Sequence, residues 1–256
     1  MDEIRRLSHD STNQKVHDLI ATDGLEHRRV LDVGAGEGYF SALVGERLKA
    51  RGIAPASVLR ACDLYPGMFK YPDVPCDAID AAGALPYGDS SFDATCAVEV
   101  VEHLEDQFHF ARELYRVTKP GGRAIVTTPN LLNVNSRLRY LSNGFWLLFD
   151  PLSLTSRDPV HTAGHIHPIT AYYLAYLFHR AGFTEVRIHF DRHKRSAVAW
   201  CVLLAPLLLL GRWRLGARLA RKNPAVYAEN AGLMATLNSW GMLTSRSVVL
   251  EALKTR

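Results

Sequence analysis

A glycine-rich turn directly after a short apolar run is the feature that most constrains how this chain folds. Residues 30–33 read Val-Leu-Asp-Val, and Gly34, Gly36 and Gly38 follow at alternate positions. Because glycine has no Cβ atom, the backbone can turn sharply there and approach a ligand closely. Apolar residues then recur at helical spacing over residues 40–48. The turn therefore joins a buried strand to a helix, which is the repeating unit of α/β folds.

Further strand-like runs alternate with helical patterns through the rest of the chain. Helices are predicted at residues 109–117 and 169–181, the second capped by Thr170 and ended by Gly182. Strands after the first are predicted at residues 58–62, 78–79, 92–98, 123–127, 184–190 and 247–252. Because strands alternate with helices, we expect a largely parallel sheet with right-handed crossovers.

The acids around the glycine turn indicate the charge of its ligand. Asp32 precedes the turn and Glu37 lies inside it, in a G-x-G-x-G spacing that differs from the G-x-G-x-x-G of dinucleotide enzymes. Carboxylates repel a phosphate but attract a sulfonium with an amino-acid ammonium. Asp63, at the end of the next predicted strand, can accept hydrogen bonds from both hydroxyls of a ribose. These acids favour a cationic nucleoside, while a nicotinamide oxidoreductase, which shares such a sheet, remains an alternative.

In this order and spacing, the motifs resemble those of the class I S-adenosylmethionine-dependent methyltransferase family. The resemblance covers roughly residues 25–190 and the final strand, and includes residues 91–99 and the Lys-Pro-Gly-Gly turn at 119–122. It implies a Rossmann-like three-layer α/β sandwich with a seven-stranded, mostly parallel sheet. It also implies that the last strand is antiparallel and forms a hairpin with the sixth, and that S-adenosyl-L-methionine is the cofactor.

The resemblance also implies which residues bind this donor. Asp63 matches the family's ribose-binding acid, and Asp80 resembles the acid that meets the adenine amino group, with Ala81 supplying a backbone amide. The full expected set is Asp32, Gly34, Ala35, Gly36, Gly38, Asp63, Leu64, Asp80, Ala81 and Glu99.

Two histidines are the candidates for chemistry on the methyl acceptor. An oxygen or carbon nucleophile usually needs its proton removed, and histidine is the side chain best tuned for this near neutral pH. His103 follows the predicted strand at 92–98, where the edge of such a sheet places functional groups. His165 belongs to a histidine cluster at 161–167 and is the second candidate, although both histidines also suit purely structural roles in a cap or a loop.

A metal site is the alternative use of the same residues. Glu99, Glu102 and His103 form an E-x-x-E-H pattern that resembles the metal motif of small-RNA 3′-terminal methyltransferases and of some ubiquinone-pathway O-methyltransferases. His165 would then supply a further ligand, in a set suited to Mg²⁺, Mn²⁺ or Zn²⁺. Because the pattern also occurs in metal-free relatives, no metal is favoured.

Relative to the family, the chain carries three additions within a single domain over residues 1–256. We expect an N-terminal helical extension at 1–29, a substrate-side insertion at 130–168, and an apolar and basic helical insertion at 192–244, between strands six and seven. Within the last, an apolar run over residues 197–211 is shorter than the roughly 20 residues that span a bilayer. It is expected to be either a buried or an interfacial helix.

These features predict a methyltransferase for a small-molecule or lipid-linked acceptor, most simply attacked through oxygen. The insertion predicts either peripheral membrane contact through residues 197–222 or a homodimer contact. A formal net charge of +4 argues against DNA as a partner and disfavours the alternative of an RNA-terminus methyltransferase. A non-catalytic donor-binding scaffold is the remaining alternative.

The expected location is cytoplasmic, at most peripheral to the inner face of the membrane. The four cysteines show no C-x-x-C spacing, and no apolar stretch follows the charges of the first residues.

Overall fold

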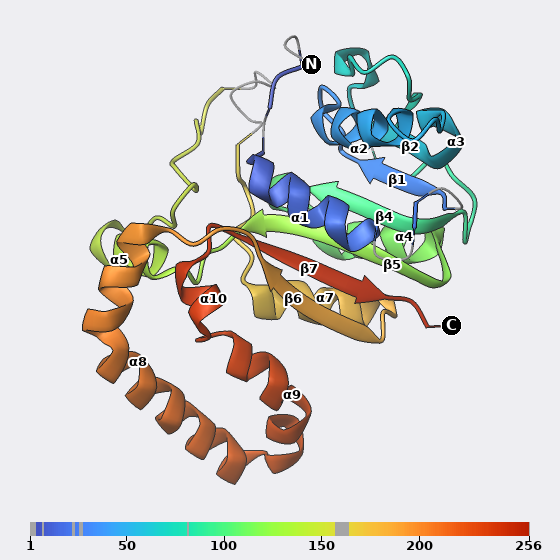
Figure 1. The fold of residues 1–256 in the computed structure, drawn as a ribbon. Helices are drawn as coiled ribbons and strands as arrows, with labels where there is room; N and C mark the ends of the chain where they lie inside the picture. Colours follow the sequence, from blue (N-terminus) through green and yellow to red (C-terminus); the bar gives the residue numbers. More distant parts are fainter. Residues whose placement is uncertain are drawn as a thin grey trace.

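A computed structural model describes residues 4–6, 8–21, 24–25, 28–80, 82–156 and 164–255 of the chain. Within these residues, one seven-stranded sheet has the order β3-β2-β1-β4-β5-β7-β6 (Figure 1). The strands are β1 (Val30–Val33), β2 (Leu59–Asp63), β3 (Cys76–Ala78), β4 (Phe92–Val98), β5 (Thr118–Pro129), β6 (Glu185–Phe190) and β7 (Ser247–Leu253).

The pairing of the strands confirms the expected fold class. β1 lies parallel to both β2 and β4, and β5 continues the parallel order beside β4. β7 lies antiparallel between β5 and β6. One boundary differs from the prediction, because β5 begins at Thr118 rather than at residue 123. Thr118 already pairs with Phe92, ahead of a shift in register, so the expected Lys-Pro-Gly-Gly turn lies inside the strand.

Helices cover both faces of the sheet, which gives the expected three layers. One face packs against α4 (Gln107–Val117) and α7 (Ala171–Ala181), and the other against α1 (Asp10–Ile20) and α2 (Tyr39–Lys49) (Figure 1). A short helix, α3 (Pro55–Val58), leads into β2. α7 ends at Gly182, in a left-handed conformation as predicted, but Thr170 makes no side-chain cap hydrogen bond at its start.

The parallel strands end at one edge of the sheet, and this edge positions the site. The glycine turn follows β1, Asp63 ends β2, and Glu99 follows β4. Because β7 runs antiparallel, it begins at the same edge, and Arg246 precedes its first residue. Ligands of open α/β sheets bind beside the carboxyl ends of the strands, so this edge is where a site is expected.

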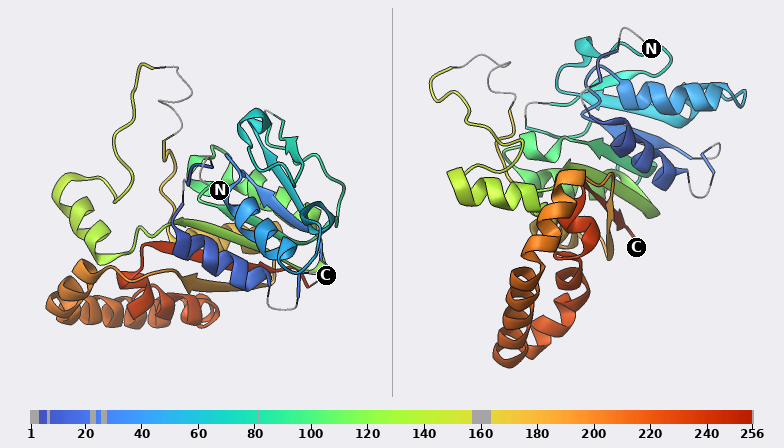
Figure 2. Two further views of the ribbon diagram at one scale, coloured as in Figure 1. Left: turned by 45° about the horizontal axis from the view of Figure 1, so that its top comes forward. Right: turned by 60° about the vertical axis from the view of Figure 1, so that its left-hand side comes forward.

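The connection between β6 and β7 forms a helical hairpin that extends away from the sheet (Figures 1 and 2). It consists of α8 (Arg195–Lys222) and α9 (Pro224–Thr236), and α10 (Trp240–Thr244) leads back into β7. At its base, α8 packs against α10 and against α5 (Val134–Asn143) through a small apolar cluster. The expectation of a buried helix is wrong, since only 11% of the most apolar window of α8 is buried.

Candidate active site

A cavity of about 200 Å³ opens at the carboxyl edge of the sheet. The glycine turn forms one wall, the end of β4 another, and the segment around His165 a third. Eight of the residues singled out from the sequence line it: Asp32, Gly34, Ala35, Gly36, Glu37, Glu99, His103 and His165. The structure therefore brings the expected donor loop and both candidate histidines to a single space.

The backbone of the glycine turn explains why its residues are glycines. Gly34 and Gly36 have φ angles of 69° and 55°, in the left-handed region that side chains disfavour. A Cβ atom on Gly34 would lie 2.6 Å from Cγ2 of Val100. The Gly34 amide donates to the carbonyl oxygen of Cys62 (2.8 Å), which ties the turn to β2.

Asp63 connects the glycine turn to the loops after β2 and β3. One of its carboxylate oxygens accepts from the Gly36 amide (2.9 Å), and the other accepts from the Tyr65 amide (2.8 Å). Its carbonyl oxygen accepts from the Ile79 amide (2.9 Å), which holds the segment leading to Asp80 alongside. Hydrogen bonds to Asp63 therefore link the glycine turn with the loops that follow β2 and β3.

Four of the expected donor residues, Gly38, Asp63, Leu64 and Asp80, lie outside the cavity lining. Gly38 is the N-cap of α2, and Leu64 is exposed. The carboxylate of Asp80 accepts from the Ala84 amide (2.8 Å) and is exposed to solvent. Ala81 lies outside the described residues.

Two acids that line the cavity have raised pKa values, and of these Asp32 is buried and Glu99 is half-buried. Ser41 donates a hydrogen bond to the carboxylate of Asp32 (2.7 Å), but burial raises the pKa of Asp32 to about 7. Glu99 has a φ of 57° and accepts from the Thr127 hydroxyl (3.0 Å), and burial raises its pKa as well. A cation entering the cavity would favour the ionised form of both carboxyls.

Glu37, the acid inside the glycine turn, also lines the cavity, but its carboxylate is held by other residues. The carboxylate of Glu37 accepts from the Arg5 amide and from Nζ of Lys70, both at 2.8 Å, and these contacts lower its pKa. The hydroxyl of Tyr39 donates to Asp10 at the start of α1 (2.7 Å). The N-terminal segment therefore lies against the glycine turn, and its Arg5, Ser8 and Asn13 also line the cavity.

The two candidate histidines lie edge to face, with ring centroids 4.8 Å apart. His103 belongs to the short helix η2 (Val101–His103), and its Nδ1 lies 3.0 Å from the carbonyl oxygen of Gly164. Because a carbonyl oxygen only accepts, Nδ1 carries the proton and Nε2 is left as an acceptor. Burial, with the charge of His103, lowers the pKa of His165.

Glu102 is buried beneath these histidines without a hydrogen-bond partner for its carboxylate. Its side chain is 0% exposed, and neither oxygen has a partner among the described residues. Burial, with the nearby Glu99, raises its pKa well above the usual value. Nε2 of His165 lies 4.0 Å from Oε1 of Glu102, an ion-pair distance rather than a hydrogen bond.

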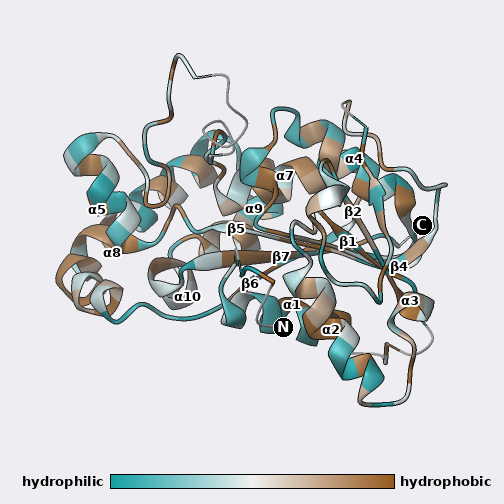
Figure 3. Ribbon diagram, turned by 90° about the horizontal axis from the view of Figure 1, so that it is seen from above, coloured by the Kyte–Doolittle hydropathy of each residue, from teal (hydrophilic) through white to brown (hydrophobic). Residues whose placement is uncertain are grey.

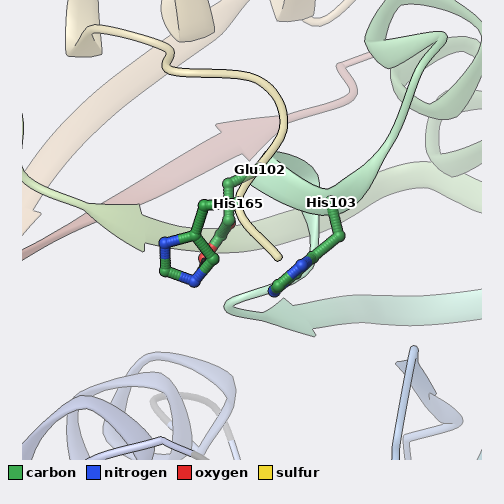
Figure 4. A group of neighbouring side chains, drawn as sticks. All are labelled: Glu102, His103 and His165. Carbon is green, nitrogen blue, oxygen red and sulfur yellow. Dashed lines mark ion pairs between the residues drawn. The ribbon is translucent and has the colours of Figure 1, made fainter. Parts of the chain in front are cut away.

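Three residues of the E-x-x-E-H alternative therefore meet in space (Figure 4). One potential ligand atom from each of Glu102, His103 and His165 lies within 4.8 Å of the others. Glu99 is not part of this group, because its carboxyl is turned to Thr127.

The sequence reasoning missed Arg246, which lines the cavity beside Glu99 and whose charge offsets part of the rise that burial causes in the pKa of that acid. Its guanidinium has no carboxylate partner among the described residues. Arg246 could have been predicted from the antiparallel last strand, because that strand has to begin at the edge where the parallel strands end. His167 lies outside the cavity lining and contacts the carbonyl oxygen of Leu104 (2.7 Å).

The sequence is similar to known methyltransferases. Residues 3–188 match a family described as a methyltransferase domain. A 2-methyl-6-phytyl-1,4-hydroquinone methyltransferase from Synechocystis sp. is 42% identical over 106 residues, which cover 40% of this chain and 32% of that protein. A ubiquinone biosynthesis O-methyltransferase from Pseudomonas fluorescens is 30% identical over 128 residues, covering 48% and 53%. The chain thus spans only about a third and about half of the lengths of these two curated relatives.

Among solved structures, a SAM-dependent methyltransferase from Archaeoglobus fulgidus has the same fold. The two structures have a TM-score of 0.55 over 96% of this chain and 94% of that chain, with 18% identical residues. At this identity the likeness shows the fold alone.

Proposed function

Because the chain belongs to the class I S-adenosylmethionine-dependent methyltransferase family, we propose that it methylates an oxygen of a small-molecule or lipid-linked acceptor. The observation that carries this proposal is the shared cavity, in which the glycine turn and two histidines face the same space. The methyl donor of the family is S-adenosyl-L-methionine. The cavity is therefore the place where donor and acceptor would meet.

The residues around the glycine turn hold the donor in this proposal. The turn lets the backbone approach the donor closely, and Asp32 and Glu99 supply negative charge to its ammonium and sulfonium groups. Asp63 ends β2 and Asp80 lies on the loop after β3, where the nucleoside would extend. Holding the methyl group in line with the nucleophile contributes several kcal/mol toward the barrier.

His103 is the proposed general base. As the acceptor oxygen forms a bond to the methyl carbon, the carbon–sulfur bond breaks and the hydroxyl proton moves to Nε2 of His103. The products are the methylated acceptor, S-adenosylhomocysteine and a protonated imidazole. Gly164 holds Nδ1 of His103, and His165 packs against the ring, so both orient the base.

The relatives and the hairpin favour an apolar acceptor. The names of the two similar proteins refer to a phytyl hydroquinone and to ubiquinone biosynthesis. In this chain, α8 exposes an apolar surface and starts close to the cavity edge. We therefore place the protein in the cytoplasm with peripheral membrane contact through residues 197–222, in preference to a homodimer contact.

Two histidine variants test the proposal, with His179→Ala, outside the cavity, as the matched control. Assays would use quinol and prenylated phenol acceptors, with donor affinity measured by calorimetry with S-adenosylhomocysteine. His103→Ala should lower turnover by roughly 100-fold or more, and His165→Ala should lower it less, while both keep donor affinity. Equal loss of donor affinity in both variants would show that these roles are misassigned.

The alternatives predict other results in the same assays. A scaffold would bind S-adenosylhomocysteine but turn over no acceptor, and an RNA-terminus enzyme would act only when RNA 3′ ends are supplied. An oxidoreductase would be stabilised against heat by NADH rather than by S-adenosylhomocysteine.

A second candidate is metal-assisted methyl transfer, which the unpartnered Glu102 favours. A buried carboxylate without a hydrogen bond is costly unless a ligand satisfies it, and two imidazoles lie within reach. Glu102, His103 and His165 would hold the ion, a donor set that suits Zn²⁺ or Mn²⁺. A bound divalent ion supplies polarisation of the acceptor oxygen.

Calorimetric titration of chelator-stripped protein with Mg²⁺, Mn²⁺ and Zn²⁺ separates the two candidates. Under metal assistance, the protein gives a saturable heat with one of these ions that Glu102→Gln abolishes. Glu105→Gln, an exposed acid in the same segment, should leave that heat unchanged. No heat with any ion would remove the metal and leave His103 as the base.

A further inference from the structure

The outer surface of the α8–α9 hairpin is apolar on every side of α8. At about 100° per residue, Trp200 and Leu207 project to one side of the helix, and Val202 and Leu209 project to the opposite side. All four are exposed, by 44–70%. A helix that is apolar all round lies in a protein core or in a membrane, and the low burial of α8 excludes the core. Figure 3 shows these hydrophobic segments at the periphery of the molecule.

The hairpin is also the most basic part of the chain. Residues 195–236 contain six arginines and lysines and one acid, Glu229, whereas the whole chain has a net charge of +4. Five of the six follow the apolar run and lie in the outer half of α8: Arg212, Arg214, Arg218, Arg221 and Lys222. Among the described residues, none of these five pairs with a carboxylate. An apolar helix followed by unpaired basic residues is complementary to a bilayer with anionic headgroups.

The lengths of the two helices decide whether the hairpin could span a bilayer or would lie at its surface. By length and composition alone, α8 is long enough to cross a membrane. However, α9 has 13 residues and is about 20 Å long, too short to return through a hydrocarbon core of about 30 Å. Both ends of the hairpin join strands of the same sheet, so the chain has to return to its starting side. The hairpin therefore fits the interface of one leaflet.

Exposed tryptophans lie on the hairpin and at its base. Trp200 and Trp213 on α8 and Trp240 at the start of α10 are all exposed. Tryptophan prefers the headgroup region of membranes, because its ring is apolar and its N–H group is polar. Trp200 lies within the apolar run, Trp213 lies within its basic continuation, and Trp240 lies where the hairpin returns toward β7.

The base of the hairpin is joined to the cavity. The Lys194 amide, just before α8, donates to the carbonyl oxygen of Thr244 (2.8 Å), and His193 forms a bridge with Ser245. The next residue, Arg246, lines the cavity. Through its first turns, α8 also packs on α5, which belongs to the segment after β5 on the same edge.

We propose that the α8–α9 hairpin docks the protein onto an anionic lipid bilayer and thereby brings the cavity to acceptors dissolved in the membrane. The proposal deepens the proposed function and rests on it for the identity of the acceptor. A second copy of the chain fits the surface less well. A partner helix would cover one side of α8 and leave the opposite apolar side exposed.

Vesicle flotation of the full chain, with S-adenosylhomocysteine present, tests the docking. We expect binding to vesicles of phosphatidylcholine with 30% phosphatidylglycerol, and at least about tenfold weaker binding to phosphatidylcholine alone. Raising the salt concentration should weaken the binding to the anionic vesicles, because the charges at the interface are screened. The tryptophan emission should shift to shorter wavelength when the protein binds.

Variants separate the apolar and basic contributions. A triple variant, Val202→Ser with Leu207→Ser and Leu209→Ser, should reduce flotation at least about tenfold. A second, Arg214→Gln with Arg218→Gln and Arg221→Gln, should remove the preference for phosphatidylglycerol. Because all six positions are exposed, both variants should fold. Leu154→Ser, which changes a fully exposed leucine elsewhere, is the matched control and should bind like the parent.

Two outcomes would overturn the docking proposal. One is equal flotation of the parent, the control and both triple variants. The other is a stable dimer in sedimentation analysis that the apolar triple variant dissociates, together with no vesicle binding. The proposed function fails separately, if the protein neither binds S-adenosylhomocysteine nor methylates a short-chain, water-soluble acceptor.

Discussion

The glycine turn and the α8–α9 hairpin differ in how much the rest of the chain constrains them. In the turn, positive φ angles, the close Val100 side chain, and hydrogen bonds from Gly34 to Cys62 and from Gly36 to Asp63 constrain the backbone from inside the chain. In the hairpin, the side chains of α8 are mostly exposed and contact little of the remaining protein. The backbone stereochemistry of the chain therefore determines the glycine turn, where the donor is proposed to bind. The exposed apolar surface of the hairpin is instead suited to contact with something outside the chain.

The largest expected effect is the pH dependence that Asp32, beside the glycine turn, gives to the free energy of unfolding. The pKa of Asp32 is raised to about 7 in the folded protein, above an ordinary value of 3.8. The folded state therefore keeps a proton that the unfolded state releases between these values. Asp32 lowers the free energy of unfolding as the pH rises through this window, by roughly 4 kcal/mol if the full shift applies.

Asp32→Asn should remove this dependence, because the amide does not ionise. Urea unfolding from pH 4.5 to pH 8, with the ligand absent, measures it. The variant should gain stability relative to the parent as the pH rises. Parallel pH profiles for the two proteins would mean that Asp32 is not held in the protonated form.

The next effect is a local one at the glycine turn. Gly34→Ala places a Cβ atom 2.6 Å from Val100 at a positive φ. We expect a loss of about 2 kcal/mol in the free energy of unfolding and a large loss of affinity for S-adenosylhomocysteine. Gly144→Ala also has a positive φ but open space around it, so it isolates the cost of the backbone angle. Equal losses in both variants would remove the steric part of the account.

The smallest effect is expected in the hairpin, and a matched pair of leucines measures it. Leu207 is exposed and Leu243 is buried at the hairpin base. Leu207→Ala should change the free energy of unfolding by no more than about 0.5 kcal/mol, and Leu243→Ala should lower it by about 2 kcal/mol or more. If Leu207→Ala is as destabilising as Leu243→Ala, the hairpin is packed in solution and the contrast disappears.

The sequence predicts the sheet well where strands are buried on both faces. The bounds of β1 and β4 are those expected, since a central parallel strand is a largely apolar run, interrupted here by Asp32 in β1 and by Asp93 and Thr95 in β4. α8 is harder, because its apolar run ends at residue 211 but the helix continues to Lys222. Arginine, leucine and alanine are good helix formers, and Pro206 lies within the helix rather than ending it.

In the candidate site, too, local features are predicted from the sequence and contacts between distant segments are not. The glycine turn is predicted from local spacing, because the backbone requirement and the residue type coincide. The approach of His165 to Glu102 depends on a loop more than sixty residues along the chain, which no local pattern specifies. Likewise, the pairing of Glu99 with Thr127 joins two strands, and it separates Glu99 from the other members of the E-x-x-E-H pattern.

A crystal structure with S-adenosylhomocysteine would locate the donor directly. We expect the amino-acid part of the ligand to lie against Gly34 and Gly36, with its ammonium near Asp32 or Glu99. We also expect the sulfur to face the space in front of Nε2 of His103. A ligand bound elsewhere, or a sulfur turned away from both histidines, would contradict the proposed arrangement of donor and base.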